Sequence, residues 1–207
     1  MLDCDVPEGY FGLMNRPLLR TTTAAGDLPR RAFTVAELEE MTKAGILRED
    51  ERIELIGGEI VPMSPKGNHH EVLKTALTVY WSRLLPPEFL FTTETTFYFT
   101  EDTFLEPDFV FYPTAVGWKG LNPRTAKLVV EIADSSLAYD LGKKAGLYAT
   151  FGIAELWVIH AVTLDTRIHR EPTPTGYRIN VDLPRDSRLV PSLLPSLAVT
   201  LSELELH

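Results

Sequence analysis

The fold is decided by residues 106–144, which read EPDFVFYPTAVGWKGLNPRTAKLVVEIADSSLAYDLGKK. Two segments of this stretch, 108–112 and 127–133, carry apolar residues on both faces. Such segments are typical of strands at the centre of a sheet. The first segment begins with the carboxylate of Asp108, and the second contains Glu131. We therefore predict two central strands that bring two carboxylates to the edge of a sheet.

These two carboxylates have the chemistry of a metal site. Alternation along the strands lets Asp108 and Glu131 reach one spot if the strands pair. Their oxygens, with the carbonyl of Ile132, suit a hard cation such as Mg²⁺. Such an ion polarises a phosphodiester and lowers the pKa of a bound water. A lysine on the short helix that begins near Asp140 would hold that water or stabilise the developing charge.

A plainer interpretation of the same residues stays open. A carboxylate near the end of a strand is usually solvated, and a Pro-Asp pair is common by chance. Asp140 and Lys144 lie four residues apart, which is also the spacing of an ion pair on the surface of a helix. A serine hydrolase is disfavoured, because Ser135 and Ser136 are not backed by an Asp–His pair in the pattern.

The rest of the pattern predicts an α+β chain, or an α/β chain with a mixed sheet flanked by helices. Thr34 and Glu37 form a capping box that begins a helix, and Gly45 ends it. Gly57-Gly58 joins two short strands in a hairpin. The pair His69-His70 is expected just before the next helix. Further elements are predicted as helices over 72–84 and 140–151, and as strands at 91–100, 156–159, 167–171 and 177–182.

Length, charge and cysteine content narrow the class of protein. The 207 residues fit one domain, placed at 32–207 after a loosely ordered N-terminal arm over 1–31. One cysteine, Cys4, excludes an internal disulfide and a cysteine-rich zinc site, so we expect a reducing, cytoplasmic location. No apolar run approaches the length of a membrane span. The net charge of −9 argues against strong nonspecific nucleic-acid binding but leaves room for a local basic groove.

Several motifs of the chain together resemble one family. They are Pro107-Asp108, Glu131-Ile132-Ala133-Asp134-Ser135-Ser136, Tyr139-Asp140-x-x-x-Lys144-x-x-x-Tyr148, Trp157-Val158-Ile159 and, upstream, Arg52-x-Glu54-Leu55-Ile56, Met63-Ser64-Pro65 and His70. This combination resembles the Uma-type restriction endonuclease family. That family belongs to the PD-(D/E)XK, or restriction-endonuclease-like, superfamily. The resemblance spans roughly residues 32–205.

The resemblance implies a restriction-endonuclease-like fold, a mixed β-sheet flanked by helices, and a metal-dependent phosphodiesterase site. Asp108, Glu131 and the carbonyl of Ile132 would bind Mg²⁺ or Mn²⁺, and Lys144 would be the catalytic lysine. In the superfamily this lysine usually lies two residues after the acidic residue, where this chain has Ala133. The family instead carries the lysine on the following helix, which matches Lys144.

Further site residues follow from the same resemblance. Glu54 matches the glutamate of the family's first hairpin and would act in catalysis by adding a metal ligand or orienting one. Lys143 competes with Lys144 and, with His70, is a candidate for contact with the substrate. One position departs from the family in a way that bears on the site, because His160 stands where an aspartate is common.

Three hypotheses about function result. The first is a Mg²⁺- or Mn²⁺-dependent endonuclease that hydrolyses DNA and forms a homodimer, because cutting both strands needs two active sites or a reorientation. The second is a non-catalytic protein-interaction module that keeps the nuclease fold, which the acidic balance favours. The third keeps the site and changes the substrate to RNA or a nucleotide. A panel of nucleic-acid substrates separates the three.

Overall fold

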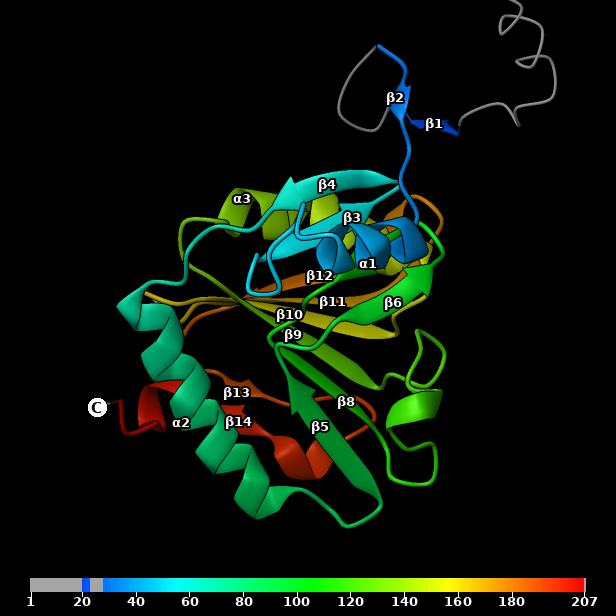
Figure 1. Cartoon of the computed structure of the whole chain (residues 1–207). Helices are drawn as coiled ribbons and strands as arrows, with labels where there is room; N and C mark the ends of the chain where they lie inside the picture. Colours follow the sequence, from blue (N-terminus) through cyan, green and yellow to red (C-terminus); the bar gives the residue numbers. More distant parts are fainter. Residues whose placement is uncertain (1–19, 23–27, 207) are drawn as a thin grey trace, which may run out of the picture.

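A mixed six-stranded sheet lies at the centre of the computed structural model, which describes residues 20–22 and 28–206 (Figure 1). The strand order is β12-β11-β10-β9-β8-β5. Strands β9 and β10 run parallel, and the other neighbours run antiparallel. The strands are β5 (Phe89–Thr93), β8 (Phe109–Pro113), β9 (Leu128–Ala133), β10 (Glu155–His160), β11 (Thr166–Thr173) and β12 (Gly176–Leu183).

A smaller antiparallel sheet, in the order β4-β3-β7-β6, lies beside the first. Its strands are β3 (Ile53–Ile56), β4 (Glu59–Pro62), β6 (Phe97–Thr100) and β7 (Thr103–Leu105). The helices are α1 (Val35–Lys43), α2 (Asn68–Leu84), α3 (Leu137–Tyr139) and α4 (Ala145–Thr150), with a π-helical turn at Asp140–Lys144. Two strand pairs complete the fold: β1 (Thr21–Thr22) with β2 (Arg30–Arg31), and β13 (Arg188–Leu189) with β14 (Val199–Thr200). This arrangement confirms the predicted mixed sheet flanked by helices.

One face of the large sheet is covered by α2 and the C-terminal segment (Figure 1). Trp81 of α2 lies at the centre of this contact and is fully buried. Its ring meets those of Phe109 and Phe111 edge-on, with centroids 5.1 and 5.2 Å away. Its indole N–H donates to the carbonyl of Leu197 at 3.0 Å. The polar edge of the tryptophan is therefore satisfied while its apolar body fills the core.

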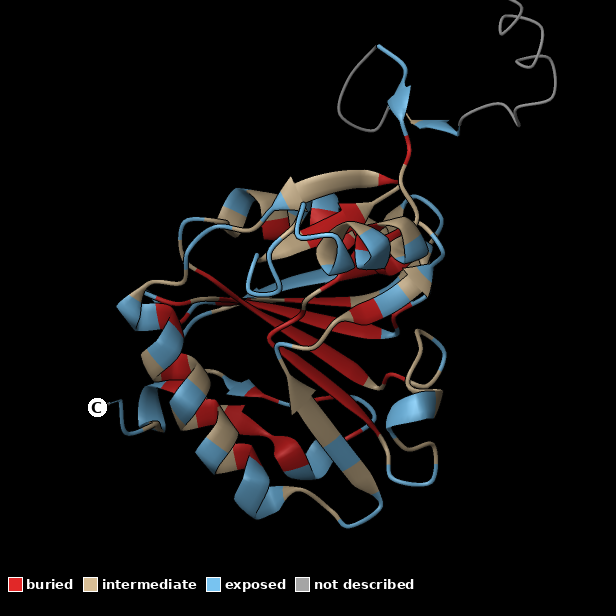
Figure 2. Ribbon diagram, viewed as in Figure 1, coloured by how far each residue is buried: buried red, intermediate tan, exposed pale blue. Residues whose placement is uncertain are grey.

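The other face of the large sheet packs against α4 and against strands of the smaller sheet. Tyr148 of α4 and Phe97 of β6 are both buried in this second cluster, together with Val129 of the central strand. Strands β8, β9 and β10 are consequently buried along nearly their whole length (Figure 2). This confirms the prediction that the two carboxylate-bearing strands are central.

Local signals at the start of the domain are confirmed as well. The Thr34 hydroxyl accepts the Glu37 N–H, and the Glu37 carboxylate accepts the Thr34 N–H, which is the capping box. Gly45 follows the helix with a φ of +71°. In the hairpin, Gly57 and Gly58 have φ angles of +56° and +84°, as a two-residue turn of the hairpin type requires.

The pattern at 91–100 does not form one strand, so that prediction is wrong. The segment divides into β5, in the large sheet, and β6, in the smaller one. The break falls after Thr93, where Glu94 adopts a φ of +49°. A residue in this region of backbone space turns the chain and ends the pairing of the strand before it.

Two helix boundaries also differ from prediction. The pair His69-His70 lies inside the first turn of α2, which begins at Asn68, because Gly67 takes the extended N-cap conformation. The helix expected over 140–151 begins earlier, at Leu137, and is interrupted by the π-helical turn. The predicted end is confirmed, since Gly152 follows with a φ of +80°.

Most of the predicted N-terminal arm, residues 1–19 and 23–27, lies outside the described residues. Within the described residues, no helix is long and apolar enough to cross a membrane.

Candidate active site

The pairing of β8 with β9 brings the two predicted carboxylates together. Phe109 lies opposite Val130 in this antiparallel ladder, so the next position places Asp108 beside Glu131. A buried backbone contact fixes the first of them, because the Ile132 N–H donates to Asp108 Oδ2 at 2.7 Å. Both carboxylates are 4% exposed. The plainer interpretation of a solvated strand end therefore does not hold for either residue.

The π-helical turn directs Lys144 into the same place. The N–H of Ala145 donates to the carbonyl of Asp140, five residues earlier, and this widens the helix by one residue. Lys144 is 4% exposed, whereas its neighbour Lys143 is exposed to solvent. Asp140 is buried as well, so the spacing of four does not mark a surface ion pair. Single π turns of this kind are often found at functional sites.

Lys144 connects the two sheets of the molecule. Its Nζ lies 2.8 Å from Glu54 Oε1, on β3, and 3.1 Å from Glu131 Oε1, on β9. Glu54 also accepts the hydroxyl of Tyr139 at 3.2 Å and the N–H of Glu106 at 3.1 Å. Strands β3 and β9 therefore each supply a carboxyl group to one buried ammonium group, and Glu54 is itself held by two further hydrogen bonds.

A second group of charges surrounds Asp108 from the side of α2. Its Oδ1 accepts a hydrogen bond from Lys66 Nζ at 2.8 Å and lies 2.9 Å from His70 Nε2. Lys66 also pairs with Glu94, which Lys74 contacts at 2.7 Å. The structure thus places His70 beside Asp108, inside the helix and buried, and its role as a substrate contact stays a prediction.

Lys66 is a site residue that the sequence analysis missed. It lies in the loop between β4 and α2, and its side chain is only 13% exposed. No periodicity marks it, because a loop has none. A faint signal was available, since Lys66 is the one cation between the Met63-Ser64-Pro65 motif and His70.

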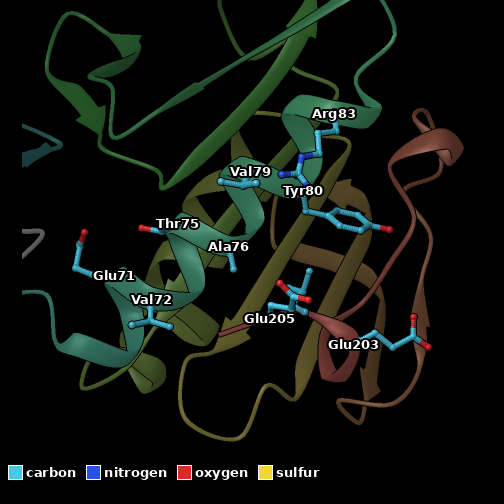
Figure 3. Close-up of a pocket in the computed structure, with 10 residues that line it drawn as sticks. Glu71, Val72, Thr75, Ala76, Val79, Tyr80, Arg83, Glu203 and Glu205 are labelled. Carbon is cyan, nitrogen blue, oxygen red and sulfur yellow. The ribbon is translucent and has the colours of Figure 1, made fainter. Parts of the chain in front are cut away.

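These groups line a cavity of about 400 Å³. Its walls include six of the seven predicted site residues, namely Glu54, His70, Asp108, Glu131, Ile132 and Lys144, together with Lys66. Lys143 is not among the lining residues, so the structure separates it from the others. A larger hollow of about 640 Å³ lies between α2 and the C-terminal segment, around Val79, Tyr80 and Glu203 (Figure 3). That hollow holds none of the convergent buried charges, and we place the site in the smaller cavity.

Burial and crowding set the proton affinities of these groups. Burial, together with the charges of Asp108, Asp140 and Glu54, raises the pKa of Glu131 to about 8, although Lys144 acts in the opposite direction. Burial would also raise the pKa of Asp108, but His70 and Lys66 outweigh it and lower this pKa to about 2. Burial disfavours the charged form of Lys144, and the carboxylates of Glu131 and Glu54 reverse that effect and raise its pKa.

The donor set fits a hard divalent cation. Two buried carboxylates and the neighbouring carbonyl of Ile132 are oxygen ligands, and Mg²⁺ completes such a set with water. Burial is the main cause of the raised pKa of Glu131, and the neighbouring carboxylates Asp108, Asp140 and Glu54 add to it, so a cation at this place would favour the ionised form. Among the described residues, no three histidine, cysteine, aspartate or glutamate side chains form a group that could hold a metal ion by themselves. A cation bound by Asp108 would compete with Lys66, whose Nζ lies 2.8 Å from Asp108 Oδ1, and waters or a substrate oxygen would supply its remaining ligands.

The buried Glu131 predicts a pH dependence of stability. Its pKa in the folded protein, about 8, lies above the ordinary value of 4.5, so the folded state binds the extra proton between these limits. The free energy of unfolding should therefore fall as the pH rises from 4.5 to about 8, by up to about 1.4 kcal/mol per pH unit from this group.

Urea denaturation of the wild type and of Glu131→Gln at several pH values measures this contribution. The substitution keeps the shape of the protonated side chain and removes its titration, so the variant should show a shallower slope over the same range. Equal slopes would mean that Glu131 titrates near its ordinary pKa.

Two comparisons relate this chain to known proteins. The model of the Uma2 family, described as "Putative restriction endonuclease", matches residues 35–202. A solved structure described as a "putative nuclease belonging to DUF820 from Anabaena variabilis ATCC 29413" is similar in fold, with a TM-score of 0.62 and 17% sequence identity. The match covers 83% of this chain and 96% of that one. No curated protein matches the chain.

Proposed function

The chain belongs to the Uma2 family of restriction-endonuclease-like proteins, and from this premise we propose that it is a nuclease that hydrolyses phosphodiester bonds in DNA with Mg²⁺ or Mn²⁺. One observation carries the proposal. Glu54, Asp108, Glu131 and Lys144 come from four different elements, and all four are buried around one cavity. Burying that many charges costs stability, and an active site is a common reason for a fold to keep them.

Asp108, Glu131 and the carbonyl of Ile132 are the groups that would hold the cation. When bound, the ion supplies a Lewis acid for the phosphodiester and lowers the pKa of its water. The chain's own residues have further tasks. Asp108 is fixed for its role by the hydrogen bond from the backbone of Ile132. Tyr148 holds the other carboxylate, because its hydroxyl donates to Glu131 Oε1 at 2.5 Å.

Lys144 is proposed as the catalytic lysine. Its ammonium group would stabilise negative charge on the scissile phosphate and orient the attacking water. Glu54 holds it in place from β3, so Glu54 is proposed as a residue that positions the lysine rather than as a metal ligand. Lys66 lies in the loop before α2, and His70 lies in α2 itself. Both would contact phosphate oxygens once the cation has replaced them as the partner of Asp108.

The remaining parts of the proposal concern the partner and the assembly. DNA would bind through the local cations of the cavity, Arg52, Lys66 and Lys144, despite the net charge of −9. We propose a homodimer, because a duplex presents two strands to be cut, and a cytoplasmic location, as the single cysteine indicates.

A substrate panel tests the proposed function. Supercoiled plasmid, linear duplex DNA, single-stranded DNA and RNA are incubated with the protein and Mn²⁺ or Mg²⁺, and parallel samples contain a chelator. We expect cleavage of DNA that the chelator abolishes. Cleavage of RNA alone would change the substrate class.

The non-catalytic module is the second candidate, and one observation favours it. Lys66 pairs with Asp108, and Lys144 pairs with both Glu54 and Glu131, so each of these carboxyl groups already has a cationic partner without any ligand. Failure to cleave any nucleic acid in the panel, with no Mn²⁺ binding by calorimetry, would support this reading and overturn the nuclease proposal.

A further inference from the structure

Strand β12 is an open edge of the large sheet. Of the described residues, only those of β11 pair with it, and the pairing runs from Gly176 to Leu183. The middle five residues, 178–182, are all exposed. A long exposed edge with free N–H and C=O groups is a template for pairing with another strand, and proteins usually cover or protect it.

The sequence of this edge is complementary to itself. It reads Arg178-Ile179-Asn180-Val181-Asp182. In an antiparallel pair of two copies centred on Asn180, each Arg178 lies opposite an Asp182 and each Ile179 lies opposite a Val181. Opposite charges and apolar β-branched residues are the favourable cross-strand pairs in sheets. We propose that β12 is the docking surface for a second copy of this chain, in this register.

The charged side chains of β12, Arg178 and Asp182, can exchange their partners within one chain for partners in the second copy. Arg178 pairs with Glu171 at 3.2 Å, and Asp182 pairs with Arg167 at 2.6 Å, all within one chain. The side chains of Arg178 and Asp182 are 73% and 70% exposed, and pairs that are this exposed contribute little stability. Contact with the partner adds an opposite charge to each of them. The same two charges disfavour a shifted register, because each of them would then lie opposite an apolar residue or opposite a residue of the same charge.

An apolar margin runs along the same edge. The exposed side chains of Ile179 and Val181 are on one face of β12. Val190 is a further exposed valine, and its carbonyl accepts a hydrogen bond at 2.7 Å from Arg170, the residue opposite Ile179 in the ladder. A two-fold axis through Asn180 brings the margins of both copies together, so the partner covers apolar side chains that one chain alone leaves in water.

The apolar C-terminal segment is a poorer candidate for this contact. Its residues Leu194, Leu197 and Leu201 are buried in the core of their own chain. The inference does not depend on nuclease activity, since β12 carries none of the proposed site residues. The proposal is therefore tested only by measuring whether two copies of the chain associate through β12.

Cysteine cross-linking tests the register. All variants carry Cys4→Ser, which removes the only native thiol. With Asn180→Cys, the two thiols face each other across the axis, at a Cα separation of about 4.5–5.5 Å that a disulfide can span. Mild oxidation should convert most of this variant into a covalent dimer. Arg178→Cys should not cross-link with itself, but mixing it with Asp182→Cys should restore the cross-link.

Analytical ultracentrifugation provides a second and independent test. The wild type should have twice the mass of one chain, and Val181→Lys should reduce it to one. The matched control is Val162→Lys, which adds the same charge at an exposed valine outside β12 and should leave the dimer intact. A wild type that stays monomeric at high concentration would overturn the proposal. So would cross-linking of Arg178→Cys alone that is as efficient as that of Asn180→Cys.

Discussion

Replacing Asp108 with asparagine is expected to lower the rate of metal-dependent DNA cleavage by about 10³-fold or more, because the metal would lose one of only two carboxylate ligands. Asparagine has nearly the same shape as aspartate and can still accept a hydrogen bond from the Ile132 N–H. The lower cleavage rate would therefore result from the missing negative charge. Initial cleavage rates in Mn²⁺ measure the effect. Calorimetric titration of Mn²⁺ into the same variant should show that the binding heat disappears as well.

Asp186→Asn is the matched control for this experiment. Asp186 is exposed in the loop after β12, so its substitution changes the net charge equally and should leave rate and binding unchanged. Thermal melts of both variants verify that each is folded. If Asp108→Asn cleaved DNA as fast as the wild type, the activity would come from a contaminant or from another site.

Lys144→Met should have the largest effect on stability, a loss of about 3 kcal/mol at neutral pH or above. Removing one partner of a buried ion pair leaves an uncompensated charge, and here Glu54 and Glu131 both lose their cation. Methionine fills a similar volume, so the loss measures charge rather than packing. The loss should grow as the pH rises above about 8, the pKa of Glu131 in the wild type, because this pKa is higher still without Lys144 and the folded variant keeps a proton that the folded wild type releases.

Lys143→Met supplies the control, because Lys143 is the preceding residue of the same turn. Lys143 is exposed, so its substitution should change the free energy of unfolding by no more than about 0.5 kcal/mol. Urea denaturation of the two variants, with DNA cleavage assayed in parallel, separates the candidates. Equal effects of the two substitutions would contradict the assignment of Lys144 as the buried lysine of the site.

Most of the fold was predictable because its signals are local and repeated. The capping box of α1, the paired glycines of the hairpin and the apolar runs of β8 and β9 each specify an element through neighbouring residues. The position of Asp108 beside Glu131 depended on one further condition, that the two strands pair, which the sequence left open and the structure shows. Lys144, by contrast, was selected by family resemblance, since spacing could not distinguish a buried π turn from a surface ion pair.

The features that could not be predicted depend on tertiary context. Glu94 turns the chain between β5 and β6 in a conformation usually reserved for glycine, so no residue type marked the break. Lys66 reaches Asp108 from a loop, across 42 positions of sequence. The edge of β12 became informative only when the structure showed which strand lacked a neighbour, because a self-complementary strand in the middle of a sheet has no such meaning.

The hydrogen bond from Trp81 to Leu197 also has a consequence for how the protein folds. It joins residues that are 116 positions apart, and Tyr80 reaches Ala198 across 118. During synthesis, α2 leaves the ribosome long before the segment around residue 197, so the apolar cluster that Trp81 forms with Phe109 and Phe111 stays incomplete until that segment has emerged. Contacts of such long range slow folding and leave apolar surface open to aggregation. A nascent chain of this protein should therefore be a chaperone client for most of its translation.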